Sequence, residues 1–88
     1  MLRLFSSPEY VKNKAKIMGL NPIYESSRKN KKYTIFDGRK WVHFGQLGYE
    51  DYTKHKDEKR RLLFRKRNHK WENSPIYSPA WLSWHLLW

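Results

Sequence analysis

The sequence contains no cysteine, which excludes disulfide bonds and thiolate metal sites within it. It also has no long hydrophobic run. The most apolar stretch, PAWLSWHLLW at 79–88, is half the length of about 20 residues that a membrane-spanning helix needs. The opening MLRLFSSPEYVKNK lacks the apolar segment of a signal peptide. We therefore expect no membrane span and a protein that is not secreted.

Acidic residues are scarce, with eight Asp and Glu against 19 Lys and Arg, so that the formal net charge is +11. Such an excess repels itself in a folded chain, and a polyanionic partner explains it best. Nucleic acid is the leading candidate. An acidic membrane surface, an acidic protein assembly and a basic protein without such a partner are the alternatives.

The 88 residues suffice for one small domain, 1–88, with a core close to the lower limit of size. Apolar residues make up 39% of the chain, but aromatic residues alone make up 17%, including five Trp and six Tyr. Because large rings bury much area per residue, a few of them can complete a small core. The composition predicts an aromatic core.

The stretch SSPEYVKNKAKIMGLNP near the start predicts a capped helix. Ser7 suits the N-cap, Pro8 the first helical position and Gly19 the stop. The apolar face of this helix is expected to comprise Tyr10, Val11, Ala15, Ile17 and Met18.

Three β-prone runs follow, at 23–26, 32–36 and 40–44, and predict a small antiparallel meander. Asp37 and Gly38 form the dipeptide typical of a two-residue hairpin turn. Alternation places Tyr33 and Ile35 on one face of the sheet.

A second helix is predicted over about 56–70, capped by Thr53 or Asp57 and basic toward its end. Leu63, Phe64, Arg67 and Trp71 fall near one side of this helix, so its apolar stripe is narrow and the rest of its surface is basic.

A short closing helix begins at Ser78 and Pro79. Its tryptophans, Trp81, Trp84 and Trp88, share one face, and Leu82, Leu86 and Leu87 cover most of the remainder. We expect most of this surface to be buried within the chain, with one Trp ring left exposed. The fold class is therefore α+β: an N-terminal helix, an antiparallel sheet of two or three strands, a basic helix and a short Trp-rich C-terminal helix.

Two clusters of cations, RKNKK at a predicted hairpin tip and KRRLLFRKRNHK on the basic helix, favour contacts with phosphates. One such cluster is usually a solvated face, but two clusters together with the net charge indicate binding of a polyanion. No zinc finger or RNA-binding sheet signature accompanies them, so base-specific recognition is not predicted. The predicted nucleic-acid-binding residues are Arg28, Lys29, Lys31, Lys32, Arg39, Lys59, Arg61, Arg65, Lys66, Arg67 and Lys70.

The four histidines, at 43, 55, 69 and 85, lie too far apart to form a local metal-binding motif, so no metal and no cofactor are predicted. His43 is expected to pack within its strand.

The loop YEDYTKHKD raises a second question, because Asp51, His55 and Asp57 offer the minimum for acid–base chemistry. No nucleophile motif, phosphate loop or metal spacing accompanies them. We therefore interpret the loop as structural, with Arg60 or Arg61 pairing with Asp51 or Asp57, and we predict no catalytic residues.

The segments SSRKNKKYTIFDGRKWVHFGQLGYEDYTKHKDEKRR, RNHKW and SPAWLSWHLLW resemble a family of small basic proteins of unknown function. These proteins are encoded by large double-stranded DNA viruses, mimivirus-like and phycodnavirus-like. The resemblance spans about 26–88, and Asn68 interrupts an Arg-His pair that is usual in that family. The resemblance implies a setting in the virion or in the viral factory of the host cytoplasm.

The leading functional hypothesis is non-enzymatic, largely sequence-independent binding of viral double-stranded DNA, or another polyanion, for compaction or packaging. A second hypothesis is a minor structural virion protein that bridges capsid or core subunits and contacts other virion proteins. A third is a small metal-dependent nuclease. The oligomeric state is not predicted.

Overall fold

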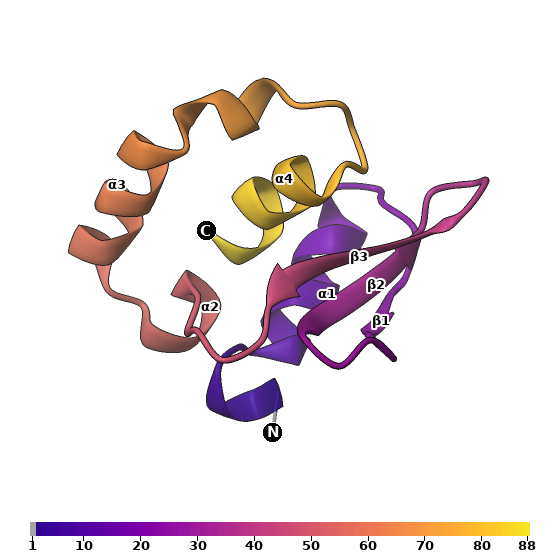
Figure 1. Cartoon of the computed structure of the whole chain (residues 1–88), viewed down its shortest axis with the longest axis horizontal. Helices are drawn as coiled ribbons and strands as arrows, with labels where there is room; N and C mark the ends of the chain where they lie inside the picture. The colour runs from indigo at the N-terminus through magenta and orange to yellow at the C-terminus, as the bar shows by residue number, and fades with distance from the viewer. Residues whose placement is uncertain (1) are drawn as a thin grey trace.

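A three-stranded antiparallel sheet with helices on one of its faces organises the computed structural model, which describes residues 2–88 (Figure 1). The α+β class, the N-terminal helix and the short C-terminal helices are confirmed. In chain order the elements are η1 (Leu2–Leu4), α1 (Pro8–Ile17), β1 (Ile23–Glu25), β2 (Lys31–Phe36), β3 (Trp41–Gln46), α2 (Tyr52–His55), α3 (Glu58–Arg67), η2 (His69–Asn73), α4 (Pro79–Leu82) and η3 (Ser83–Leu87).

The strands follow the order β1-β2-β3, and their register sets the two faces of the sheet. Tyr33 pairs with Phe44 and Ile35 with Val42, and all four side chains are buried. The predicted alternation is thus confirmed for Tyr33 and Ile35. On the opposite face Tyr24, Phe36 and Trp41 are exposed.

The turn between β2 and β3 differs from the predicted two-residue hairpin. Phe36 pairs with Trp41, so four residues, 37–40, form the loop. The Asp37 side chain accepts hydrogen bonds from the main-chain N–H groups of Arg39 and Lys40, at 2.7 and 2.8 Å. This side-chain bridge stabilises a longer turn than the Asp-Gly dipeptide alone would favour.

Helix α1 begins as predicted, with Ser7 at the N-cap and Pro8 at the first helical turn. Its buried face is narrower than predicted, because Pro8, Val11 and Ala15 are the residues that face the core. Ile17 is 77% exposed, and Tyr10 and Met18 are exposed as well, so the assignment of these three residues to that face was wrong. The i, i+4 spacing of Val11 and Ala15 defines the stripe that packs on the sheet.

The predicted basic helix over 56–70 is interrupted at both ends. Lys56 adopts a left-handed conformation, φ 55°, which separates the single turn of α2 from α3. Asn68 ends α3, and its side-chain N–H₂ donates to the carbonyl oxygen of Phe64 at 3.1 Å. The chain then continues into η2 instead of a regular helix.

The segment formed by α4 and η3 closes the core. The Ser78 side chain caps α4 by accepting a hydrogen bond from the N–H of Trp81, as its position predicted. The leucines of this segment enter the core, since Leu82, Leu86 and Leu87 are almost fully buried. They pack with the apolar residues of α1 and the sheet, namely Val11, Ala15, Ile23, Tyr33, Ile35, Val42 and Phe44.

The prediction that one tryptophan ring of this segment is left exposed was wrong. Trp84 is 6% exposed, and Trp81 and Trp88 are partly buried against the edge of the core. In Figure 1, α3 and η2 form an arc beside α4, on the side away from the sheet. None of the helices in residues 2–88 is long and apolar enough to cross a membrane.

Candidate nucleic-acid interface

None of the side chains of helix α3 is fully buried, so the helix has no anchor in the core. It is held in place by aromatic stacking at its edge instead. The Phe64 ring stacks on the Trp88 ring with centroids 4.2 Å apart and planes 6° from parallel. Phe64 also meets Trp71 of η2 edge to face at 5.6 Å. Trp88 is therefore the main anchor between the basic helix and the rest of the domain.

Two arginines of α3 contribute to the same anchor. Arg61 Nε and Arg65 Nη2 donate to the main-chain oxygen of Trp88, at 2.7 and 3.1 Å. The Arg61 guanidinium also lies over the Tyr52 ring at 4.5 Å, and that of Arg65 lies over Trp84 at 5.3 Å. Because these groups are engaged inside the fold, Arg61 and Arg65 are removed from the set of cations proposed to contact phosphates.

Lys32 is a further correction to the predicted set, because its side chain points into the protein and is 3% exposed. Its ammonium donates to Asp51 Oδ2 at 2.9 Å, and Asp51 is fully buried. Burial lowers the pKa of Lys32, and the neighbouring Asp51 carboxylate opposes this shift. The predicted partner of Asp51 was Arg60 or Arg61, but its partner in the structure is Lys32.

The loop around Asp51 forms one end of a directed hydrogen-bond chain. Tyr33 donates its hydroxyl to Ser6 Oγ at 2.7 Å, Ser6 Oγ lies 3.1 Å from Thr53 Oγ1, and Thr53 donates to Asp51 Oδ1. Burial raises the pKa of Tyr33, which keeps its hydroxyl protonated as the donor. The chain ties the N-terminal segment and β2 to the start of α2, so Asp51 is a structural residue.

Asp57 and His55 occupy the junction between α2 and α3. Of the two predicted caps, Thr53 and Asp57, Asp57 caps α3, since its carboxylate accepts from the N–H groups of Lys59 and Arg60 at 3.0 and 3.2 Å. His55 Nδ1 accepts from the main-chain N–H of Asp57 at 2.9 Å, which places the ring proton of neutral His55 on Nε2. Nε2 is buried without a hydrogen-bond partner, and the ring lies 5.2 Å from that of Trp88.

This arrangement does not bring Asp51, His55 and Asp57 together as an acid–base group. Asp51 is enclosed by Lys32 and Thr53, whereas the interaction of His55 with Asp57 is through the main chain. Burial lowers the pKa of His55, which favours the neutral ring. Among residues 2–88, no three or more His, Asp or Glu side chains are grouped so that they could hold a metal ion.

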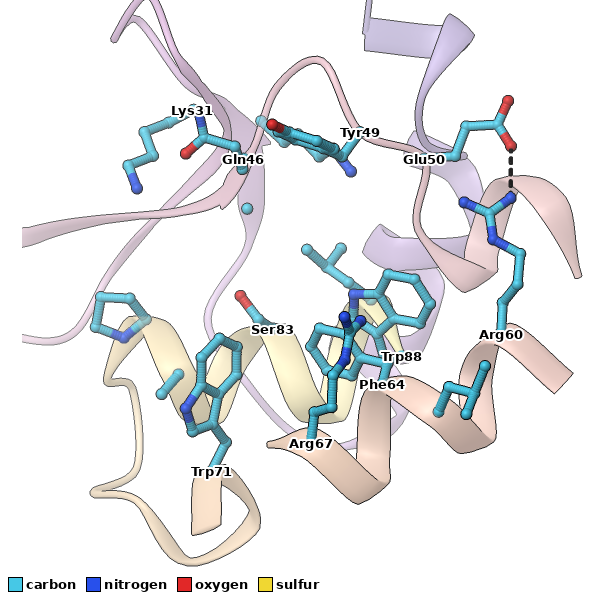
Figure 2. A pocket seen from close by; sticks show the side chains of 16 residues that line it. Lys31, Gln46, Tyr49, Glu50, Arg60, Phe64, Arg67, Trp71, Ser83 and Trp88 are labelled. Atoms are coloured by element: carbon cyan, nitrogen blue, oxygen red, sulfur yellow. Dashed lines mark ion pairs between the residues drawn. The ribbon is translucent and has the colours of Figure 1, made fainter. Parts of the chain in front are cut away.

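Arg60 forms an ion pair with Glu50 instead, with Nη1 and Oε1 3.6 Å apart and both side chains about half exposed. The pair joins α3 to the loop between β3 and α2, and Figure 2 shows it beside a cleft. An exposed pair of this kind contributes about 0–1 kcal/mol to stability. Its position matters more than its strength, because it connects the two sides of the cleft.

We call this hollow the α3 cleft. It has a volume of about 820 Å³. The start of β2, the end of β3 and the β3–α2 loop form one wall, α3 and η2 form the other, and α4 and η3 form the floor. The lining residues are Lys31, Lys32, Gly45, Gln46, Tyr49, Glu50, Arg60, Leu63, Phe64, Arg67, Trp71, Pro79, Ala80, Ser83, Leu87 and Trp88.

Side chains from both walls converge on the α3 cleft, as the labelled residues in Figure 2 show. Tyr49 lies across the upper wall, with Trp71 and Arg67 opposite it. Tyr49 is 70% exposed, and Arg67 is exposed as well. The cleft thus combines open aromatic surface with cations from segments about 36 positions apart, Lys31 and Arg67.

The remaining predicted phosphate contacts divide into two groups by location. Arg28 and Lys29 are exposed in the loop that leads into Lys31, close to the cleft in sequence. Lys59, Lys66, Arg67 and Lys70 are exposed on α3 and η2, and of these four Arg67 lines the cleft. Arg39 is exposed in the β2–β3 turn, at the opposite end of β2 from Lys31, so the structure does not bring it to the cleft.

A protein family described as "Family of unknown function (DUF5754)" matches residues 22–68, more than half of the chain. The chain belongs to this family. No curated protein and no solved structure matches it. The stretch shared with the family runs from β1 to the end of α3, so it supplies both main walls of the α3 cleft, whereas Trp71 and the floor lie outside it.

Sequence reasoning missed two residues that shape the cleft. Gly45 was left outside the predicted run 40–44, but it lies within β3 at φ 82°, and a Cβ placed there would approach Leu87 Cδ1 to 2.9 Å. Tyr49 was passed over because a single Tyr in a Gly-containing loop carries no motif. The only sequence signal for either was the pair of glycines, Gly45 and Gly48, that bracket the turn.

Proposed function

We propose that the protein binds nucleic acid through phosphate contacts, with little preference for base sequence and without catalysing a reaction. The observation that carries this proposal is the convergence of two cationic segments on one cleft. Lys31 lines one wall and follows the loop that carries Arg28 and Lys29, and Arg67 at the end of α3 lines the other wall. A polyanion that follows the cleft would meet cations on both sides.

The charge of these segments is available to a partner. Neither Lys31 nor Arg67 takes part in a salt bridge within residues 2–88. Glu50, the one acidic residue among 2–88 that lines the cleft, is already paired with Arg60, and the buried Asp51 is paired with Lys32. The field at the cleft is therefore positive, as a phosphate-binding surface requires.

The viral setting is part of the proposal and derives from the motif resemblance. In that setting the nucleic acid is viral double-stranded DNA, the role is compaction or packaging, and the protein is located in the virion or the viral factory.

The test is a titration of the purified protein onto unrelated duplexes across a salt series. With about six phosphate contacts, the slope of log affinity against log salt should be about −5, and affinities for unrelated sequences should agree closely. A flat salt response or a strong preference for one sequence contradicts the proposal.

A matched pair of double variants locates the contacts. Replacing Lys66 and Arg67 by Ala should reduce the magnitude of the salt slope by about 2, since each phosphate contact contributes about 0.9. The control replaces Lys12 and Lys16 of α1, which are exposed and line a separate hollow that shares no residue with the α3 cleft. Equal losses in the two variants would show that the binding surface is not the cleft.

The second candidate, a structural virion protein, is supported by a different surface. Trp81, Trp84 and Trp88 belong to the fold, so they are not the anchor first considered. On the open face of the sheet, however, Tyr24 and Trp41 are each 52% exposed and Phe36 is 38% exposed, with their rings packed side by side. An exposed aromatic patch of this kind is typical of a protein contact. Loss of virion incorporation by a folded Trp41→Ser variant that still binds DNA would support this candidate.

A further inference from the structure

We infer that the α3 cleft receives the base of an unpaired nucleotide, so that the protein binds single-stranded nucleic acid more tightly than phosphate contacts alone allow. The inference rests on the proposed function and names the substrate class of the same site. It follows from three properties of the cleft: its aromatic lining, the position of its cations and its size.

The lining offers flat apolar surface to a flat ligand. Tyr49 stands on one wall, and Trp71 and the stacked rings of Phe64 and Trp88 stand on the other (Figure 2). Phe64 and Trp88 are fixed in place by their mutual stacking. Within residues 2–88, Tyr49 forms no ring pair, and most of its surface is exposed to solvent. Tyr49 is therefore free to stack on a base, an interaction that tolerates any sequence.

The cations lie where the phosphates of such a nucleotide would be. Lys31 and Arg67 are on opposite walls, so the backbone on either side of an inserted base meets a positive charge. Gln46 and Ser83 line the same space and offer an amide and a hydroxyl group to the polar edge of the base. Because an amide both donates and accepts, these groups can satisfy different bases without selecting one.

Size and charge together favour this occupant over others. The volume of about 820 Å³ falls within the usual range for sites that bind small ligands, about 300–1,000 Å³. A base-paired duplex can reach the cations of the cleft through its phosphates but cannot place a base in the hollow, since its bases are stacked inside the helix. An apolar peptide would fill the aromatic lining but leave Lys31 and Arg67 without a counter-charge.

The test compares two single-stranded probes with the same number of phosphates. One is a thymidine oligonucleotide of about a dozen residues, within the usual site size, and the other carries abasic units in its central part. The protein should bind the thymidine probe roughly 5-fold to 150-fold more tightly, which corresponds to about 1–3 kcal/mol for one stacked base. Equal affinity for both probes would overturn the inference and leave the proposed function standing. If neither probe nor any duplex binds, both fail.

A matched pair of tyrosine variants locates the base. Tyr49→Ala should remove most of the difference between the probes, whereas Tyr24→Ala, at an exposed tyrosine on the open face of the sheet, should retain it. Both side chains are more than half exposed, so neither change should unfold the protein. The opposite result would place the base on the sheet and contradict the cleft assignment.

Photo-crosslinking supplies an independent readout. A probe with a photoreactive thymidine should attach to Tyr49, Trp71 or their neighbours in the cleft, as identified by mass spectrometry. Attachment confined to Tyr24, Phe36 or Trp41 would overturn the inference. An apolar peptide in the cleft should displace the thymidine probe more readily than the abasic probe. Equal displacement of the two probes would also count against the inference.

Discussion

The buried ion pair between Lys32 and Asp51 should dominate the response of this domain to single substitutions. Asp51→Asn preserves the shape of the side chain and its acceptor for Thr53 but leaves the Lys32 ammonium facing a neutral amide. Among residues 2–88, the only other acceptor of that ammonium is the Phe5 carbonyl oxygen, at 3.4 Å. Breaking one side of a buried pair costs about 3–5 kcal/mol. Because a small domain is stable by only about 5–15 kcal/mol, this change removes a large part of the total.

A double-mutant cycle separates the pair from its surroundings. Lys32→Met should destabilise the protein to a similar extent, since it leaves the Asp51 carboxylate buried without its cation. The double variant, Lys32→Met with Asp51→Asn, should be less destabilised than the sum of the two changes, with a coupling of about 1–3 kcal/mol. Urea unfolding followed by circular dichroism measures all three variants.

The neighbouring acid provides the control. Glu50→Gln breaks the half-exposed pair with Arg60 and should change stability by no more than about 1 kcal/mol. An Asp51→Asn effect as small as that of Glu50→Gln would refute the burial argument. Strict additivity of the two core substitutions would refute the pairing.

The pH dependence of the Asp51→Asn variant provides a second check. Burial lowers the pKa of Lys32 in the folded state, and this variant removes the opposing effect of Asp51. Between the lowered folded pKa and the ordinary value of about 10.4, the unfolded chain binds a proton that the folded chain does not. The stability of the variant should therefore rise with pH in that range. A decrease would contradict the assigned cause.

Three further predictions concern the packing around the cleft and the core. Gly48→Ala should lower the free energy of unfolding by about 1–3 kcal/mol through its φ of 103° alone, since no atom lies within 4 Å of an added Cβ. Gly45→Ala should lower it by about 1–3 kcal/mol more, because its Cβ would meet Leu87 and Lys32. Equal unfolding free energies of the two variants would contradict the contact. Because burial lowers the pKa of His55 below about 6.5, the free energy of unfolding should fall as the pH drops below that value. His55→Gln should flatten the dependence of the melting temperature on pH, whereas His69→Gln, at an exposed position, should not. Identical profiles of the two variants would refute this. Truncation after Pro79 should abolish cooperative unfolding in circular dichroism, since each of three lost core leucines contributes about 2–5 kcal/mol, and a folded truncation would show that the core lies elsewhere.

The sequence predicted the local elements of this fold well, because they depend on short-range signals. The Ser7-Pro8 and Ser78-Pro79 helix starts and the Asp57 cap follow from the chemistry of helix N-termini. The alternation of Tyr33 and Ile35 likewise follows from strand geometry. These features were correct because each is decided within a few residues.

The positions of the cations could not be predicted in the same way. Lys32 lies in a run of four cations at a predicted hairpin tip, yet the strand begins at Lys31 and turns Lys32 inward to Asp51. Arg61 and Arg65 were assigned to solvent because nothing nearby in sequence could engage them. Their partner is the main-chain oxygen of Trp88, 27 and 23 positions away. Long-range pairing of this kind has no local pattern.

The α3 cleft was beyond sequence reasoning for the same reason. Its walls come from separate parts of the chain, and their approach depends on where Trp88 is placed by the core leucines. Composition indicated a basic protein with a surplus of aromatic rings. It did not indicate that some of those rings and some of those charges would face one another across a hollow.

Because α3 and the adjoining η2 have no fully buried side chain, we expect them to be released by local unfolding more readily than the central strand. Their amide hydrogens should exchange with solvent at a lower opening free energy than those of β2, which lies in the centre of the sheet. The α3 cleft would then exist only in the fraction of molecules in which Phe64 is docked on Trp88. Any ligand that touches both walls would select that fraction, and its measured affinity would be reduced by the population of the open form. The Phe64–Trp88 stack therefore sets both the shape of the cleft and the proportion of molecules in which it is present.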